Sequence, residues 1–242
     1  MRTENEKRGR SNRGKGLRWN QECVNHVKFN GWPKAKRQRY DRAGDIVGVP
    51  GICLECKDTD WQAVPAALDQ AARDAVALDV PRGVVMLKRA GHRKVADGLW
   101  LGRVGAELAT ARAAGYRVAA STRALAAPLG GHTDPGAAGL VESRVEAFAP
   151  SILAVCQYVR WLDVPAALDA ARDYAATTPG LFSRVVLIKR QRGNDDPMAG
   201  YWIGTIGAEL AAERDRQGAA EHAARLVDAI ATEQAITSWA RP

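Results

Sequence analysis

The chain has 242 residues, which is long enough to bury one large core or two small ones. Its charged fraction of 26% and hydrophobic fraction of 46% are typical of a globular protein, and no apolar run approaches the roughly 18–20 residues that a membrane-spanning helix needs. Because the charged N-terminus has no apolar stretch behind it and four cysteines are too few for a disulfide scaffold, we expect a cytoplasmic protein with reduced thiols and no membrane contact.

Positive charge is concentrated near the N-terminus. Residues 1–44 carry 13 Lys and Arg against 4 Asp and Glu, so this region holds the whole net charge of +8. A solubilising tail would explain residues 2–13 but not the basic run over 34–42. A basic block close to carboxylates predicts that a polyanion is held next to a metal site.

The hydrophobic pattern predicts an α/β fold with a mixed central sheet flanked by helices. Residues 1–13 are charged, lack periodicity and are expected to form a basic, disordered arm. Residues 14–115 are expected to form a first domain, which begins with a helix over 17–29 that ends before Gly31. The further expected elements are a short basic strand over 34–40, a hairpin over 45–57, a helix over 64–76, a buried strand over 83–87, a short strand over 98–101 and a closing helix over 105–113.

The hairpin over 45–57 is the stretch on which the first domain is organised. A turn at residues 49–51 pairs Ile46 with Leu54 and Asp45 with Glu55, and directly opposed residues place their Cβ atoms about 4.5–5.5 Å apart. Because side chains alternate along a strand, Lys57 shares the face of Glu55, while residues 52, 54 and 56 turn to the other face. Two carboxylates and an ammonium on one face can hold a divalent cation beside a phosphodiester.

The second half of the chain repeats the first in three ordered matches. The offset between matching residues is 100, then 101, then 102, and it changes only where loops are expected. The sequence therefore predicts a tandem duplication, with 116–143 as a linker or degraded remnant and 144–242 as a degenerate second copy. The matching segments are 61–69 with 161–169, 84–89 with 185–190, and 105–108 with 207–210.

The charged positions of the hairpin are absent from the second copy. This loss is expected if those charges serve chemistry in the first copy rather than structure. At the offset of 100, Asp45, Glu55 and Lys57 correspond to Val145, Val155 and Gln157.

The pattern Asp45, nine residues, then Glu55-x-Lys57 at the end of an apolar strand resembles the PD-(D/E)XK nuclease superfamily. With Arg13-x-Lys15-Gly16 and Glu22 before it, the resemblance narrows to the archaeal-type Holliday junction resolvases and their phage-borne relatives. It covers about residues 13–89 and implies a restriction-endonuclease-like fold. The tandem second copy and a cysteine between the Glu and the Lys depart from the family pattern.

The resemblance implies a metal-dependent, structure-selective DNA endonuclease that resolves Holliday junctions in phage or plasmid recombination. Asp45 and Glu55, assisted by Glu22, would hold Mg²⁺, for which Mn²⁺ is expected to substitute, and Lys57 would act beside the attacking water. The segment with Arg13 and Lys15 would grip phosphate. Because resolution needs two opposed cuts and one chain carries one intact site, the resemblance also implies a homodimer on four-way junction DNA.

Basic residues around the hairpin are expected to contact the DNA backbone and to make binding depend on salt. Strand alternation separates residues 34 and 36 from 37 and 39, so not all can touch one DNA strand, and a solvated edge strand is the alternative. Lys88 and Arg89 are repeated in the second half as Lys189 and Arg190. This repetition fits either a role in phosphate binding or a structural role. The residues before the hairpin are Lys34, Lys36, Arg37, Arg39 and Arg42.

Other interpretations stay open. The chain could be another nuclease of the same superfamily (restriction, repair or exonuclease), or a non-catalytic DNA-binding protein with structural acidic residues. Glu22 could equally be a solvated helix glutamate. Cys53 and Cys56 are expected in the core rather than at zinc, because they face opposite sides of a strand and no second Cys/His pair lies near.

Overall fold

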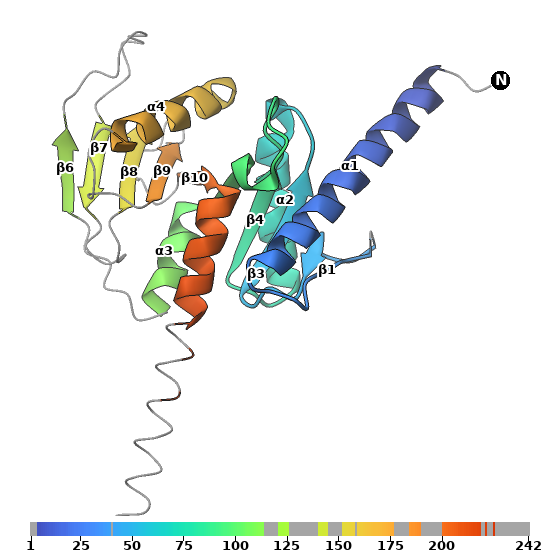
Figure 1. The fold of residues 1–242 in the computed structure, drawn as a ribbon, viewed down its shortest axis with the longest axis horizontal. Coiled ribbons are helices and arrows are strands. Elements are labelled where there is room, and N and C mark those ends of the chain that lie inside the picture. The colour runs from blue at the N-terminus through green and yellow to red at the C-terminus, as the bar shows by residue number, and fades with distance from the viewer. Residues whose placement is uncertain are drawn as a thin grey trace, which may run out of the picture.

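One mixed sheet with helices on both faces forms the frame of the molecule (Figure 1). The computed structural model describes residues 4–39, 41–113, 121–125, 140–144, 152–157, 159–176, 184–189 and 200–218, together with 221 and 225. Its architecture is α/β, as the sequence predicted. Eight strands form the sheet in the order β1-β2-β3-β4-β5-β10-β9-β8. They are β1 (Lys36–Arg37), β2 (Ile46–Val47), β3 (Ile52–Lys57), β4 (Arg82–Leu87), β5 (Leu99–Arg103), β8 (Ile152–Gln157), β9 (Arg184–Lys189) and β10 (Tyr201–Thr205).

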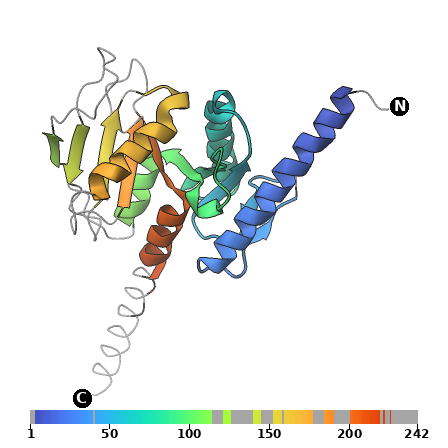
Figure 2. The same ribbon diagram turned by 45° about the horizontal axis from the view of Figure 1, so that its top comes forward.

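The helices divide between the two faces of the sheet. On one face lie α1 (Glu4–Phe29), the start of α3 (Val104–Ala113) and a helical segment over 206–218, all of which contribute to one apolar cluster. On the other face lie α2 (Val64–Ala77) and α4 (Val164–Ala176), which share a second apolar cluster. In both views α3 and segment 206–218 lie side by side (Figure 1, Figure 2). The central strands are therefore buried between two helical layers.

The first helix is longer than the sequence predicted. α1 begins at Glu4, so residues 4–13 form its first turns rather than a separate disordered arm. It ends at Phe29 as expected, because Gly31 takes φ +119° and allows the Trp32 N–H to bond the Val27 carbonyl at 3.3 Å. The buried stripe of α1 (Trp19, Cys23, Val24 and Val27) then packs on the sheet.

Most other elements of the first domain follow the prediction to within a residue or two, with one exception. The basic strand expected over 34–40 is reduced to the two residues of β1, which pair with β2. Within the expected linker, β6 (Ser121–Leu125) and β7 (Leu140–Arg144) form a separate two-stranded sheet. The other residues of that linker lie outside the described part of the chain.

Strands β3-β4-β5 and β8-β9-β10 follow the same pairing pattern toward the middle of the sheet. β3 is parallel to β4 and β4 antiparallel to β5, while β8 is parallel to β9 and β9 antiparallel to β10. β5 and β10 then pair antiparallel at the centre, where Leu101 lies opposite Ile203.

Strand pairing corrects one detail of the expected correspondence between the two halves. Ile52 lies opposite Arg82, and Ile152 lies opposite Arg184, so under the expected duplication β4 and β9 would correspond at an offset of 102 rather than 101. Lys189 therefore takes the position of Leu87, and not that of Lys88. Each strand contains a long run of apolar residues, so a shift of one residue still aligns apolar residues with apolar residues. For this reason the sequence alone did not reveal the offset of 102.

Candidate metal and phosphodiester site

The hairpin fixes Asp45 against β3. Ile46 lies opposite Leu54, in the register that the sequence predicted. The Asp45 N–H donates to the Leu54 carbonyl at 2.8 Å, and Asp45 Oδ2 accepts a 2.8 Å hydrogen bond from the Cys56 N–H. Both the backbone and the carboxylate of Asp45 are thus held by the strand.

Glu55 and Lys57 lie on the face of β3 that the Asp45 carboxylate approaches. Lys57 Nζ is 2.6 Å from Glu55 Oε2 and 3.8 Å from Asp45 Oδ2, so the ammonium contacts both carboxylates. The Glu55 side chain is only 6% exposed, whereas those of Asp45 and Lys57 are each 31% exposed. The two carboxylates therefore converge, with Asp45 and Lys57 on the side that solvent reaches.

A third carboxylate, which the sequence did not single out, comes from α2. Asp74 Oδ1 accepts a 2.7 Å hydrogen bond from Gln70 Nε2, and its Oδ2 accepts one of 3.2 Å from the Gly44 N–H. Gly44 has φ +76°, and a Cβ there would meet Cys53 Sγ at 3.0 Å, so the turn before Asp45 needs glycine. Asp74 thereby holds the residue that precedes Asp45. We name Asp45, Glu55, Lys57 and Asp74 the acidic cluster.

Burial and like charge set the protonation of the acidic cluster. Burial raises the pKa of Glu55 to about 7, and the nearby charge of Asp45 adds to the effect, while Lys57 opposes it. Burial also acts to lower the pKa of Lys57, but the hydrogen bond and charge of Glu55 outweigh it and raise that pKa. For Asp74, hydrogen bonds from Gln70 and Gly44 outweigh burial and lower the pKa. One ammonium thus stands against three carboxyl groups, which leaves the cluster receptive to a further cation.

Three of the described side chains bring donor atoms close enough together to hold one metal ion. Ligand atoms of Cys53, Glu55 and Asp74 lie within 4.8 Å of one another. Burial raises the pKa of the Cys53 thiol to about 12, so the sulfur stays protonated and is a poor ligand. The carboxylate oxygens of Glu55 and Asp74 that remain are of the kind that Mg²⁺ prefers, and Asp45 lies outside this group of three. Cys56 is buried in the cluster on the opposite face, as the alternation predicted, so the two cysteines do not converge on one ion.

Glu22 lies on α1, across the sheet from Glu55. Its neighbour Cys23 is buried with Cys56 on that opposite face. Among the described residues, no hydrogen bond or ion pair joins Glu22 to Asp45, Glu55 or Lys57. The structure thus brings Asp74 rather than Glu22 to the cluster, and a metal-binding role for Glu22 stays a prediction.

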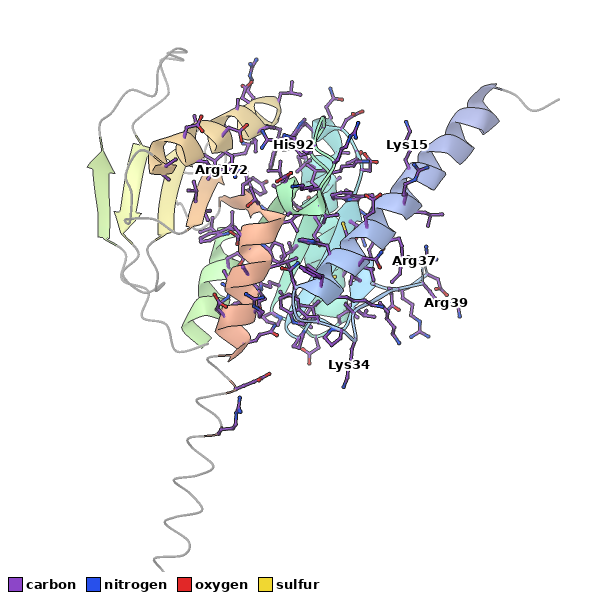
Figure 3. All side chains as sticks on the ribbon, viewed as in Figure 1. Lys15, Lys34, Arg37, Arg39, His92 and Arg172 are labelled. Carbon is purple, nitrogen blue, oxygen red and sulfur yellow. The ribbon has the colours of Figure 1, made fainter. Side chains whose placement is uncertain are left out.

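Exposed basic side chains surround the hairpin on the side of α1. Lys15 on α1 and Lys34, Arg37 and Arg39 project away from the body of the protein (Figure 3). Lys36 and Arg42 are also exposed, and Arg39 pairs with Asp41 at 3.4 Å. Arg13 belongs to α1, but its side chain lies outside the described residues.

The two basic residues after β4 are engaged within the protein. Lys88 Nζ lies 3.1 Å from Asp58 Oδ2. Arg89 is buried and forms a two-pronged ion pair with Asp169 of α4, in which Nη1 lies 2.9 Å from Oδ1. Arg89 therefore joins the two halves of the chain, while its predicted contact with DNA stays untested.

Comparisons of the chain with family models, with curated proteins and with solved structures find no match. Within the described part of the chain, no helix has the length and apolarity needed to cross a membrane.

Proposed function

We propose that the chain is a metal-dependent DNA endonuclease that cuts branched DNA, with four-way junctions as its substrate. The observation that carries the proposal is the meeting of three charged side chains on a hairpin that solvent reaches on one side. Lys57 Nζ lies 2.6 Å from Glu55 Oε2 and 3.8 Å from Asp45 Oδ2. The exposed basic side chains of α1 and the pre-hairpin segment support a polyanionic substrate.

Asp45 and Glu55, together with Asp74, would hold Mg²⁺ or Mn²⁺, which would polarise a phosphodiester oxygen and lower the pKa of a bound water. Lys57 would leave its present pairing with Glu55 as the cation takes up the carboxylate charge. Its ammonium would then orient the attacking water or balance charge on the phosphoryl oxygens. A P–O bond forms to the water oxygen and one ester P–O bond breaks, which yields a phosphate monoester and a hydroxyl.

The proposal includes a tandem duplication with a restriction-endonuclease-like first unit and a non-catalytic second unit. The matching strand order of the two halves supports it. So does the register of β8, which puts Val155 and Gln157 at the positions of Glu55 and Lys57. On α4, Tyr174 takes the place of Asp74 at the same offset of 100. The second unit would thus keep the scaffold without any acidic residue of the site.

A cleavage assay tests the nuclease proposal. The parent chain is incubated with a four-way junction, a linear duplex and a flap, with and without Mg²⁺. We expect Mg²⁺-dependent cutting of the junction, which Asp45→Asn abolishes and which the matched control Asp41→Asn, at an exposed aspartate on the same loop, retains. Equal cutting of all three substrates would favour another nuclease of the superfamily.

The non-catalytic alternative gives a different outcome in the same assay. A DNA-binding protein with structural acidic residues would bind the junction without any Mg²⁺-dependent cutting. Lys57→Ala separates the two, because loss of cutting with junction binding kept is the result expected of the enzyme.

A further inference from the structure

We infer that the second unit occupies the place that a partner subunit would take in a dimer. One chain then contains two paired units but a single cutting centre, and it makes one nick each time it binds DNA. The inference rests on the proposed nuclease function and specifies the product of that site, which is nicked DNA. It departs from the homodimer that the resemblance implied.

The contact between β5 and β10 has the form of a twofold interface between two copies. Leu101 and Ile203, which correspond at the offset of 102, lie opposite each other. On either side the pairing is reciprocal, because Trp100 lies opposite Gly204 and Gly102 lies opposite Trp202. A surface that pairs with its own equivalent is the mark of an isologous contact, which in most proteins joins two separate chains.

Side chains around this centre repeat on both sides. Trp100 Nε1 donates to Glu107 at 3.1 Å, and Trp202 Nε1 donates to Glu209 at 3.0 Å, both across seven residues. On the other face Trp61 and Trp161, which begin the equivalent turns before α2 and α4, stack with ring centroids 6.4 Å apart. The reciprocal relation thus extends through both helical layers.

Contacts between the two units make the pairing permanent. Arg82 of β4 is buried and bonds Glu107 of α3 and Glu213 of segment 206–218. Trp32 Nε1 donates to Gln217 Oε1 of that segment at 2.9 Å. One apolar cluster also runs through both units without a break. The two units therefore share one core and do not separate to admit another copy.

This arrangement fixes how many cuts one chain makes. Under the twofold relation, the second unit would face the opposed DNA strand. Its positions 155 and 157, which correspond to Glu55 and Lys57, carry valine and glutamine. The central sheet edge, β5, is already filled by β10. A chain bound to DNA therefore hydrolyses one phosphodiester and leaves the opposed strand intact.

The test uses supercoiled plasmid with an extruded cruciform, Mg²⁺ and the full chain. We expect nicked circles as the product and a mass near the 26.1 kDa of one chain by light scattering. When parent and Asp45→Asn chains are mixed, nicking should fall in proportion to the fraction of parent chain.

Two results would overturn the inference, and they are distinguishable. Linear plasmid from a two-chain species, falling with the square of the parent fraction, would show that two chains pair and would leave the nuclease proposal standing. Absence of any Mg²⁺-dependent cutting would remove the nuclease proposal and the inference together.

Discussion

Asp74 Oδ2 lies 3.2 Å from the backbone nitrogen of Gly44, and this hydrogen bond ties α2 to the turn directly before Asp45. The same carboxyl group lies against Glu55. One helix residue therefore positions one proposed metal ligand through the backbone and a second through its side chain. Residues that orient metal ligands in this way affect activity nearly as much as the ligands themselves.

Asp74→Ala should lower Mg²⁺-dependent cutting by about 10–100-fold and raise the Mg²⁺ concentration needed for half-maximal activity. The turn at Gly44 loses its acceptor, and the site loses one carboxylate. Activity measured across a Mg²⁺ titration checks this, with Asp69→Ala on the exposed face of the same helix as control. An unchanged Mg²⁺ dependence in Asp74→Ala would contradict the positioning role.

Lys57→Gln should reduce cutting by about 100-fold or more, because no other described cation lies between Asp45 and Glu55 to act beside the water. Junction affinity in Ca²⁺, measured by gel shift, should change little. If the variant cut DNA at the parent rate, Lys57 would be a structural partner of Glu55 only.

The titration of Glu55 should make the stability of the fold depend on pH in one definite direction. Its pKa is raised to about 7 in the folded protein from 4.5, so the protonated form favours folding. The contribution is fully present below about pH 4.5 and is lost as pH rises through about 7. The Tm of the parent, relative to Glu55→Gln, should therefore be higher at pH 4.5 than at pH 8, and Mg²⁺ at pH 8 should restore part of the loss. A Tm difference independent of pH would refute the raised pKa.

Arg89 and Asp169 should be energetically coupled across the two halves. A double-mutant cycle with Arg89→Ala and Asp169→Ala, read by urea unfolding, should give a coupling of about 1 kcal/mol, since the Asp169 side chain is 43% exposed and water screens the pair. Arg160 and Asp163, an exposed pair within the second half, serve as the reference cycle with a smaller expected value. Equal values for the two cycles would mean that burial of Arg89 adds nothing.

The exposed basic side chains before the hairpin should account for part of the salt dependence of DNA binding. Arg37→Ala combined with Lys34→Ala should reduce the slope of log affinity against log salt by about 2, because each phosphate contact contributes about 1. Arg172→Ala, on α4 at the other side of the protein (Figure 3), is the control and should leave the slope unchanged. A slope that stays at the parent value would place the DNA elsewhere.

Local patterns predicted the fold of the first half well. The Ile46–Leu54 register followed from the turn at residues 49–51 and from strand alternation, both of which depend on neighbours in sequence. The end of α1 followed from Gly31, whose positive φ permits the terminal hydrogen bonds. The start of α1 at Glu4 was missed, because a charged stretch without an apolar stripe gives no helical period.

Contacts between distant segments were harder to predict. Asp74 was missed because it reaches the cluster from a helix, and only its replacement by Tyr174 in the second half marked it. Arg89 and Asp169 lie 80 residues apart, and no local pattern connects them. The candidate site on one hairpin was therefore predictable, whereas the partner that positions it and the packing between halves required coordinates.

Arg82 shows why the two halves must be made together. Its guanidinium is buried between Glu107 of the first half and Glu213 of the second. A product of premature termination before segment 206–218 would keep Arg82 and Glu107 but lose Glu213, so Nη2 of the buried guanidinium would lack its acidic partner, and this unsatisfied donor would oppose closure of the core. Such a fragment should be a substrate for cellular proteases, so that only chains translated through segment 206–218 accumulate.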